Sequence, residues 1–510
     1  MFKCLYNLEL LIMASAKTPF QSYDEPIRPD TAANYVYQLK DTDVDALMIC
    51  PTAWKLPLWK SKVYPFWENE TKEMKPPYFF KELKYYEKVF WRMKEHMDTG
   101  ADPFKEAIRA AREIGISPFV SYRMNDHHNI DNPNAITHPS FWKNNSHLWI
   151  SDEERFLNYL HPEVRDFYFN ILEELVANYD VAGLELDFMR SPTFFPKNRI
   201  VEGRAVMTEF VRRVRAMLDK QGEIKGRRLH LSVRVPYTLE WSERIGLDIE
   251  RWDAEGIIDM VTLSSFFINS PELDFDNYKN IVKNAAKYGE MHVVVKQGKL
   301  KSGFSNNIVR RTTKEMYRAL SATFLDRGLD GVAFFNVEYT YHHFFNESRR
   351  AGIKDGAPPH KALRGISDLE YLRSKNKHYF VSPPFSSLPQ TNELELSLYV
   401  ADVDIGKNFK HALMRIETRD ICRNISFDAS INGVAIEEAI WTGELFPPIS
   451  YEGLPDADSV RYFRVPTDIL KHGENLIRIT NVSEVRAYKE AVFEVVELAL
   501  YKNNTLIDEE

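Results

Sequence analysis

Short apolar runs alternate with longer amphipathic stretches over the first two thirds of the chain. Apolar runs of about four to eight residues are typical of buried strands, whereas apolar positions three or four apart are typical of helices that cover a sheet. The pattern therefore predicts strands that alternate with helices, as in a parallel sheet or barrel. The predicted strands are residues 8–13, 45–50, 117–123, 181–187, 229–235, 257–263, 291–296 and 331–336.

Helices are predicted between these strands, and the clearest of them runs from Asp102 to Gly115. Asp102 is a typical N-cap, Pro103 suits a first turn, and Gly115 is a typical stop. Eight strands with intervening helices over about 340 residues predict an α/β fold, a (β/α)8 TIM barrel that occupies residues 1–365. The predicted helices are residues 31–39, 102–115, 161–179, 204–218, 247–254, 275–288 and 312–327.

The pattern changes after residue 365. Residues 366–389 contain many loop residues and prolines, which predicts a linker. From residue 390 the apolar runs shorten and alternate with polar residues, and Asn432-Gly433 is a strong hairpin-turn motif. Residues 390–510 are therefore predicted to form an all-β sandwich. Its clearest strands are residues 393–400, 412–417, 425–431 and 475–480.

Composition narrows the range of partners. The chain has 510 residues, 44% of them hydrophobic, which is ample for a buried core. Its formal net charge of −8 argues against a nucleic-acid surface, and no apolar run is long enough for a membrane span. Cys4, Cys50 and Cys422 are too widely spaced to indicate a disulfide framework or a zinc site. We therefore expect neither a nucleic-acid partner nor a membrane partner.

The first residues allow two interpretations. Lys3, the apolar stretch after it and Ala14-Ser-Ala16 faintly resemble a signal peptide with its cleavage site. However, Asn7 and Glu9 interrupt the apolar stretch, and residues 8–13 fit a first core strand. This pattern favours a cytoplasmic location, with a periplasmic or secreted location as the alternative.

The segment Val181–Arg190 contains the most informative polar residues. Glu185 and Asp187 are two positions apart in an apolar run, so both point to the same face of a strand. An acid in a buried strand is costly unless it is paired or used. Asp187 lies at the carboxyl end, where barrel enzymes place catalytic groups, and it is the first catalytic candidate. Glu185 lies deeper and is expected to be a structural partner of Arg123 or Arg234.

Glycoside cleavage requires a second carboxylate across the scissile bond. Glu338, after the eighth strand, is the predicted partner of Asp187, because the fourth and eighth strands face each other across a barrel. Asp126 and Glu240 are alternatives. Other polar residues near the carboxyl ends of the strands are candidates for substrate binding: Arg123, Asn125, Asp126, His127, Arg190, Arg234, Tyr237, Lys296 and Asn336.

Other chemistries have weaker support. Lys296 could form a Schiff base if desolvated, although pairing with a barrel acid is commoner. Histidines gather in the third loop, but no His-x-x-x-His spacing indicates a metal site. No glycine-rich phosphate loop, serine-nucleophile motif or dinucleotide motif is present, so no cofactor is expected. Tryptophans in the two long loops after the second and third strands, such as Trp54 and Trp142, could stack on sugars or simply pack those loops.

Several segments of the barrel contain recognisable motifs: residues 102–108 with 111–115, 121–126, 183–187, 246–252 and 255–259. Together these motifs resemble the glycosyl-hydrolase-like family 10 group of bacterial proteins, over residues 1–365. The resemblance implies a carbohydrate-active hydrolase in which Asp187 matches the acid of strand four, and it also implies an appended β-sandwich. Met189 stands where the similar chitinase motif has its acid, so substrate-assisted chitinase chemistry is not implied.

Three functions remain as hypotheses. The first is a glycoside hydrolase that cleaves O-glycosidic bonds of an oligosaccharide or polysaccharide by paired-carboxylate catalysis. The second is a non-catalytic carbohydrate-binding protein on a barrel scaffold. The third is a lyase or aldolase that uses Lys296. The basic residues predicted at the barrel mouth favour an acidic or sulfated sugar, unless they pair with barrel acids instead.

Overall fold

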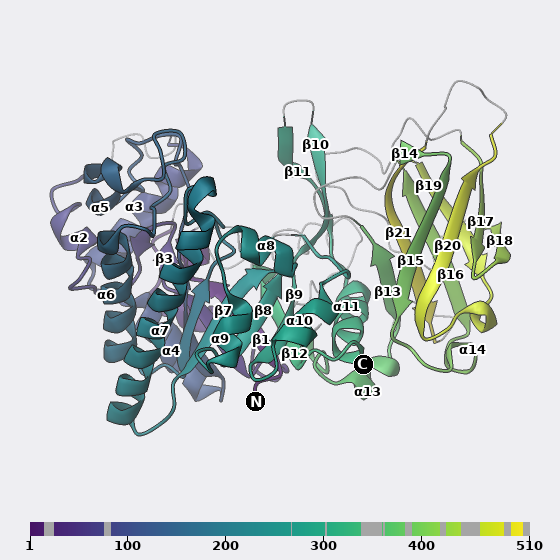
Figure 1. Ribbon diagram of the computed structural model, residues 1–510, viewed down its shortest axis with the longest axis horizontal. Coiled ribbons are helices and arrows are strands. Elements are labelled where there is room, and N and C mark those ends of the chain that lie inside the picture. The colour runs from purple at the N-terminus through teal and green to yellow at the C-terminus, as the bar shows by residue number, and fades with distance from the viewer. Residues whose placement is uncertain are drawn as a thin grey trace. The chain divides into compact units, whose positions relative to one another are not determined.

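The computed structural model describes residues 1–14, 25–75, 83–266, 268–300, 303–337, 360, 363–382, 390–418, 425–439, 459–483 and 491–502. Its strands, helices and both chain ends are shown in Figure 1. None of the described helices combines the length and the apolar character that crossing a bilayer requires.

Eight strands close into a barrel, in the order β1-β12-β9-β8-β7-β6-β5-β2. The neighbouring pairs from β1 through β2, β5, β6 and β7 to β8 are parallel. This confirms the predicted (β/α)8 barrel. The strands are β1 (Cys4–Glu9), β2 (Ala46–Cys50), β5 (Ser117–Arg123), β6 (Gly183–Asp187), β7 (His230–Pro236), β8 (Met260–Ser264), β9 (Ala286–Met291) and β12 (Gly331–Phe335).

The predicted helices are present between these strands, with shifted ends. Asp102 caps its helix as expected, because its side chain accepts a hydrogen bond from Lys105 N at 3.0 Å. The helices are α1 (Thr31–Tyr37), α4 (Pro103–Glu113), α6 (Pro162–Asn178), α7 (Ile200–Lys225), α9 (Ile249–Ala254), α10 (Phe275–Ile281) and α11 (Lys314–Asp326). Further short elements lie in the connections: β3 (Thr52–Ala53), β4 (Leu56–Pro57), α2 (Phe66–Asn69), α3 (Tyr85–Asp98), α5 (Ser140–Asn144) and α8 (Leu239–Arg244).

The first barrel strand begins earlier than the sequence pattern predicts. β1 spans Cys4–Glu9, and Leu10–Ala14 forms a 3-10 helix where a strand over residues 8–13 was expected. Every residue of both elements is buried, so the apolar run does not mark where the strand ends. Parallel pairing with β2 does mark it, because the ladder ends with Glu9 opposite Cys50. Glu9 therefore lies at the carboxyl end of β1.

The seventh barrel strand is displaced as well. β9 spans Ala286–Met291, so the predicted helix over residues 275–288 ends early, at the end of α10. The valine-rich segment predicted as that strand, residues 291–296, instead leads into β10 (Val294–Leu300), which pairs antiparallel with β11 (Gly303–Arg311). A β-branched run predicts that a strand forms, but it does not predict the partner strand.

Side chains inside the barrel change from apolar to charged along the strands. Near the amino ends, Leu5, Phe119 and Met260 belong to one buried apolar cluster. At the carboxyl ends, the backbone register places Arg123 beside Asp187 and Asp187 beside Arg234. Residues paired across neighbouring strands point to the same face. The barrel therefore has an apolar floor and a charged mouth.

The C-terminal strands form an antiparallel sheet in the order β13-β21-β16-β19-β18-β17-β20-β15, and β14 pairs with β21. This confirms the predicted all-β sandwich. Within the segment predicted as a linker, α13 (Leu369–Arg373) and β13 (Lys377–Val381) are ordered elements, and β13 pairs with β21. The other strands are β14 (Gln390–Thr391), β15 (Glu393–Val400), β16 (His411–Thr418), β17 (Phe427–Ile431), β18 (Val434–Glu438), β19 (Ser459–Val465), β20 (Gly473–Asn481) and β21 (Ala491–Tyr501).

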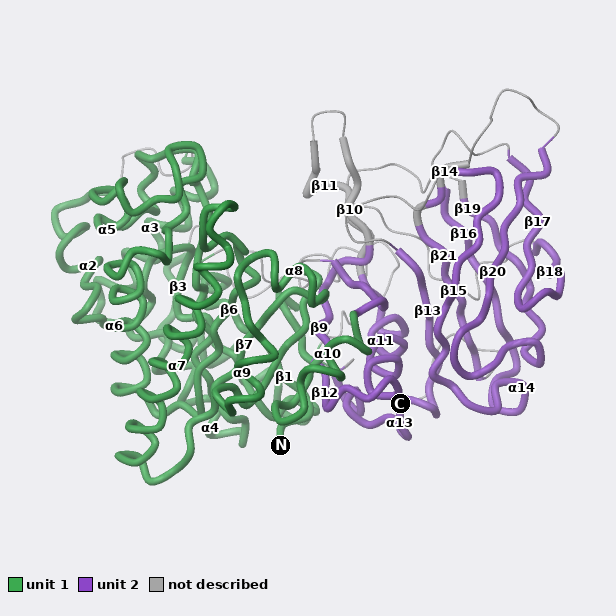
Figure 2. Tube along the Cα trace, viewed as in Figure 1, with its two compact units in different colours: residues 1–266, 274–288, 333–361 green, residues 267–273, 289–332, 362–510 purple. Residues whose placement is uncertain are grey.

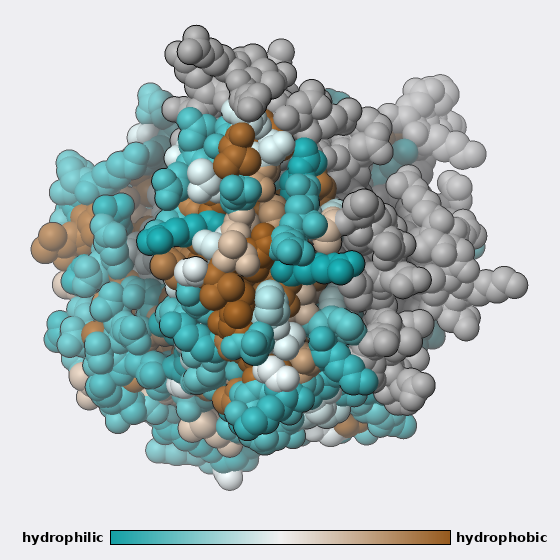
Figure 3. All heavy atoms as spheres, turned by 90° about the vertical axis from the view of Figure 1, so that its right-hand side faces the viewer, coloured by the Kyte–Doolittle hydropathy of each residue, from teal (hydrophilic) through white to brown (hydrophobic). Residues whose placement is uncertain are grey.

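Strands of the sandwich alternate between buried and exposed residues. In β20, Ile477 and Ile479 are fully buried, whereas Leu476, which directly precedes Ile477, is exposed. The predicted hairpin turn joins β17 to β18, and both Asn432 and Gly433 have positive φ, as a type I′ turn requires. A band of apolar side chains is visible on the face shown in Figure 3.

The chain divides into two compact units, which Figure 2 shows in different colours. Unit 1 comprises residues 1–266, 274–288 and 333–361, and unit 2 comprises residues 267–273, 289–332 and 362–510. Unit 1 contains most of the barrel strands, among them the carboxyl ends of β1, β5, β6 and β7.

Candidate active site at the barrel mouth

Asp187 ends strand β6, and the described residues hold its carboxylate through one oxygen. Its Oδ1 accepts hydrogen bonds from Met189 N at 2.9 Å, from Arg190 N at 3.2 Å and from the Arg234 guanidinium at 2.8 Å. The side chain is 2% exposed. Among the described residues, no group bonds Oδ2. Asp187 is thus a rigidly oriented carboxylate with one oxygen to which no described residue bonds.

Arg234, opposite Asp187 in the register with β7, is fully buried. Besides Asp187, its guanidinium donates to Ser264 Oγ at 2.9 Å and lies 3.9 Å from the ring centroid of Phe335. Because Phe335 belongs to β12, which is not a neighbour of β7, this contact crosses the barrel interior. Arg234 therefore fixes Asp187 from inside the barrel.

A second group of charges surrounds Arg123 at the end of β5. Its guanidinium donates to Glu9 and, at 3.2 Å, to Asp126 Oδ2. The other oxygen of Asp126 accepts from the backbone and from Nδ1 of His128, at 2.9 and 2.7 Å. Burial raises the pKa of Asp126, but His128 and Arg123 outweigh burial and hold that pKa well below its usual range. Asp126 is therefore an anion with both oxygens engaged.

His128 connects this group to Arg190. Burial lowers the pKa of His128 to about 4, so the ring is neutral at neutral pH. The Nδ1 proton then points to Asp126, and Nε2 accepts from the Arg190 guanidinium at 2.5 Å. The carboxylate thus selects the tautomer, and the imidazole in turn orients Arg190.

Residues after strand β2 close one side of the mouth. Lys55 Nζ donates to the backbone oxygen of His128 at 2.8 Å, and burial lowers the pKa of Lys55 to about 8. Trp54 and Trp142 are 2% exposed, and Trp59 donates to Glu174 at 3.1 Å. These tryptophans therefore pack the long loops against the rest of unit 1, as one of their two predicted roles requires, the other being stacking on sugars. A cavity lined in part by Lys55 and Trp142 has a volume of only about 30 Å³, enough for water.

Several polar atoms inside the barrel have no hydrogen-bond partner among the described residues. They are Oδ1 of Asn7, Oγ1 of Thr262 and Oδ1 of Asn336. Asn336, at the end of β12, also has a φ of 59°, an uncommon backbone conformation for a residue other than glycine. Buried polar atoms left unpaired by the protein are expected to bind water or a ligand. These atoms make the barrel interior receptive to a hydroxyl-bearing molecule.

The remaining predicted residues differ in their surroundings. Asn125 is buried and donates to the backbone oxygens of Leu157 and Thr193, at 3.2 and 2.7 Å, so it holds loops together. His127 is exposed and bonds Ser191, and Tyr237 is half-buried beside Trp241. The side chain of Lys296 and the whole of Glu338 lie outside the described residues. Lys296 was expected to end the seventh barrel strand. That expectation is wrong, because Lys296 belongs to β10, which is not a barrel strand.

Glu185 lies one layer deeper than Asp187. Its oxygens accept from Ser121 Oγ at 2.7 Å and from Ser232 Oγ at 3.2 Å. Arg123 and Arg234, the partners expected for it, bind acids at the level above. Glu185 therefore lies in a layer of hydroxyl groups below the mouth.

Sequence reasoning missed Glu9 as a member of this site, and it grouped His128 with the histidines of the third loop without assigning it a role. Glu9 was treated as an interruption of an apolar run, because the first strand was predicted four residues too late at its far end. Ending that strand at its single acid would have placed Glu9 at the mouth. His128 had no distinguishing pattern, because its role depends on contacts with Asp126 and Arg190. Among the described residues, no group of acids, cysteines and histidines could hold a metal ion.

Fold and site together define a barrel protein with a charged, hydrogen-bonding mouth. No protein-family model and no curated protein sequence matches the chain. Similar solved structures include a chitinase from Bacillus thuringiensis, at 8% identity and a TM-score of 0.42, covering 94% of this chain and 98% of that one. Alpha-L-fucosidase isoenzyme 1 from Paenibacillus thiaminolyticus has 12% identity and a TM-score of 0.38, covering 94% and 97%.

A chitinase from Paenibacillus sp. str. FPU-7 has 11% identity and a TM-score of 0.40, covering 97% of this chain and 56% of that one. The chain thus spans about half the length of that multi-modular chitinase. At these identities and TM-scores the comparisons identify no family, so the resemblance to the glycosyl-hydrolase-like family 10 group stays a prediction.

Proposed function

We propose that the barrel mouth is the active site of a glycoside hydrolase, which cleaves O-glycosidic bonds of an oligosaccharide or polysaccharide with Asp187 as one of two catalytic carboxylates. The observation that carries this proposal is the geometry of Asp187. Arg234 and two backbone amides fix Oδ1 at the carboxyl end of a barrel strand, while no described residue bonds Oδ2. An oriented carboxylate of this kind suits attack on a sugar carbon or activation of water.

The second carboxylate is proposed by comparing the candidates. Glu338 follows β12, beyond the described residues, and it remains the proposed partner. Asp126 is less suitable, because Arg123 and His128 already engage both of its oxygens. Glu240 lies on α8 with its side chain 71% exposed, in an ion pair with Arg244. Catalysis would require Glu338 to protonate the leaving oxygen while Asp187 acts from the other side.

Charges at the mouth favour a neutral sugar. Three arginines meet three carboxylates there, in the pairs Arg234 with Asp187 and Arg123 with Glu9 and Asp126, while Arg190 contacts neutral His128. Two of these guanidinium groups are paired, and the charges of the three arginines and three carboxylates balance, so little net attraction is left for a sulfate or carboxylate on the substrate. This weakens the earlier expectation of an acidic or sulfated sugar. We assign hydroxyl binding to Asn336, His127 and Tyr237, and positioning to the arginines.

Product release from a panel of plant, algal and host glycans tests the proposal. Asp187→Asn should lose about a thousandfold or more of the wild-type rate on whichever neutral glycan is cleaved, because an amide can neither attack nor accept a proton. Asp152→Asn, an exposed aspartate in the loop after β5, is the matched control and should keep the wild-type rate.

Turnover retained by Asp187→Asn would remove Asp187 from the mechanism. Saturable glycan binding without product, in both wild type and Asp187→Asn, would instead support the non-catalytic carbohydrate-binding function. Circular dichroism of each variant separates loss of catalysis from loss of fold.

A further inference from the structure

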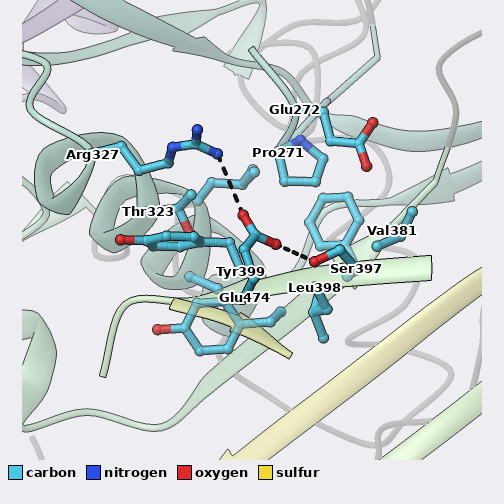
Figure 4. A pocket seen from close by; sticks show the side chains of 13 residues that line it. Pro271, Glu272, Thr323, Arg327, Val381, Ser397, Leu398, Tyr399 and Glu474 are labelled. Atoms are coloured by element: carbon cyan, nitrogen blue, oxygen red, sulfur yellow. Dashed lines mark hydrogen bonds and ion pairs between the residues drawn. The ribbon is translucent and has the colours of Figure 1, made fainter. Parts of the chain in front are cut away.

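A cavity of about 290 Å³ lies within unit 2, and none of its lining residues belongs to the barrel mouth. Its walls come from α11, β13 and β15, with contributions from β20 and from residues 271–272. Figure 4 shows these side chains gathered around one space. The volume is close to the lower limit of ordinary ligand pockets, about 300 Å³. A single small ring therefore fits its size.

Apolar side chains form the deep part of this cavity. Leu320 from α11 and Phe380 from β13 are 1% exposed, and Leu398 from β15 is 2% exposed. They have no polar group to offer, so a ligand seated here must present a hydrocarbon face to them.

The rim is polar and asymmetric in charge. Glu474 accepts a hydrogen bond from Ser397 and lies 3.9 Å from the Arg327 guanidinium, as Figure 4 shows. Arg327 also lies 5.2 Å from the ring centroid of Tyr399. Glutamate, arginine, serine and tyrosine thus present both acceptors and donors above the apolar floor.

Glu272 adds a second carboxylate to this rim. Among the described residues, its side chain has no hydrogen bond and no ion pair, unlike Glu474. Glu272 is an exposed residue of this rim, and partial desolvation, together with the negative charge of Glu474, raises its pKa. Two carboxylates and one guanidinium leave the lining with an excess negative charge, which a bound cation would offset.

We propose that this cavity binds a small amphipathic amine of the amino-sugar class, with the hydrocarbon face of the ring on Phe380 and Leu398 and the ammonium group between Glu272 and Glu474. An amino sugar combines the three features that the lining requires, namely an apolar face, hydroxyl groups and a positive charge. The proposal goes beyond glycoside hydrolysis at the barrel mouth and does not depend on it.

Isothermal titration of the full chain with glucosamine in mildly acidic buffer tests this. N-acetylglucosamine has the same ring without the charge, and it should bind at least about tenfold more weakly, as expected for loss of one charge-assisted hydrogen bond. Glu272→Gln should weaken glucosamine binding by about the same factor. Glu395→Gln, an exposed acid of β15 that pairs with Arg478 outside the cavity, is the matched control and should bind as wild type does.

Two more variants separate this cavity from the barrel mouth. Ser397→Tyr places a ring at the exposed rim and should abolish binding, whereas Asp187→Asn should leave glucosamine affinity unchanged. The proposal is overturned if wild type binds no glucosamine, if glucosamine and N-acetylglucosamine bind equally, or if Glu272→Gln and Ser397→Tyr both bind as wild type does. Loss of binding in Asp187→Asn would also overturn it, by placing the ligand at the mouth.

Discussion

Replacing Arg234 with methionine should destabilise the barrel strongly, because it leaves the Asp187 carboxylate buried without its cation. Arg234 is fully buried and Asp187 is 2% exposed, so water cannot replace the lost partner. The substitution removes hydrogen bonds of 2.8 Å to Asp187 and 2.9 Å to Ser264, and a ring contact at 3.9 Å with Phe335. Breaking a buried ion pair from one side costs about 3–5 kcal/mol of unfolding free energy.

The double variant Arg234→Met/Asp187→Leu separates the uncompensated charge from the loss of packing. It removes both charges, so we expect it to recover at least about 2 kcal/mol relative to Arg234→Met. Arg244→Met, whose side chain is 73% exposed and paired with an equally exposed glutamate, is the matched control. That substitution should change stability by less than about 1 kcal/mol.

Urea unfolding of the full chain, followed by tryptophan fluorescence, measures these differences. Eight of the nine tryptophans lie within residues 1–266, so the emission reports on unit 1. An unfolding midpoint for Arg234→Met within error of the wild-type midpoint would refute the reasoning. So would a double variant no more stable than Arg234→Met, because the cost would then come from packing and not from the unpaired acid.

Two further predictions concern the stability of the protein at low pH and the space for a side chain at Gly183. Burial lowers the pKa of His138 from 6.5 to about 4, so the unfolded chain binds a proton first as pH falls, and stability is lost between pH 6.5 and 4. His138→Phe keeps a ring against Trp142 but cannot bind a proton. Between pH 7 and 4, the free energy of unfolding measured in urea should therefore fall by about 3 kcal/mol less for His138→Phe than for wild type. Identical pH profiles for the two proteins would contradict this. Gly183→Ala would place a Cβ 2.3 Å from the backbone oxygen of His230, so we expect a loss of about 1–3 kcal/mol or failure to fold, whereas wild-type stability would show that the strands can separate there.

The sequence pattern predicted most of the architecture because buried residues recur with a fixed period along each strand and each helix. Strand β6 lies in the apolar run that ends at Asp187. Helix α4 lies between Asp102 and Gly115, the residues predicted to begin and end it. The pattern failed at residues 8–13 and 291–296, where apolar runs extend beyond the barrel strands. Burial is shared by a strand, a short helix and a hairpin, so an apolar run alone does not distinguish them.

Some residues of the site were predicted from the sequence and others were not. Asp187 and Arg234 were found because each lies near the end of a recognisable strand, and the structure brings them together. Asn125 was predicted to bind substrate, but its amide donates to two backbone oxygens of neighbouring loops. Glu9 was missed because its strand was misplaced.

The sequence by itself determined the alternation of strands and helices, the change to a β-sandwich and the position of Asp187 at a strand end, since these depend on local periodicity. Only the tertiary structure decided which acid meets which base. Arg123 reaches Glu9 across 114 sequence positions, and Arg234 reaches Asp187 across 47. Such pairs form when the closed barrel brings distant strand ends to one mouth, where the lost hydration of each charge is offset by its neighbour. The physical reason is that periodicity records burial one segment at a time, whereas charge pairing is a property of the assembled interior.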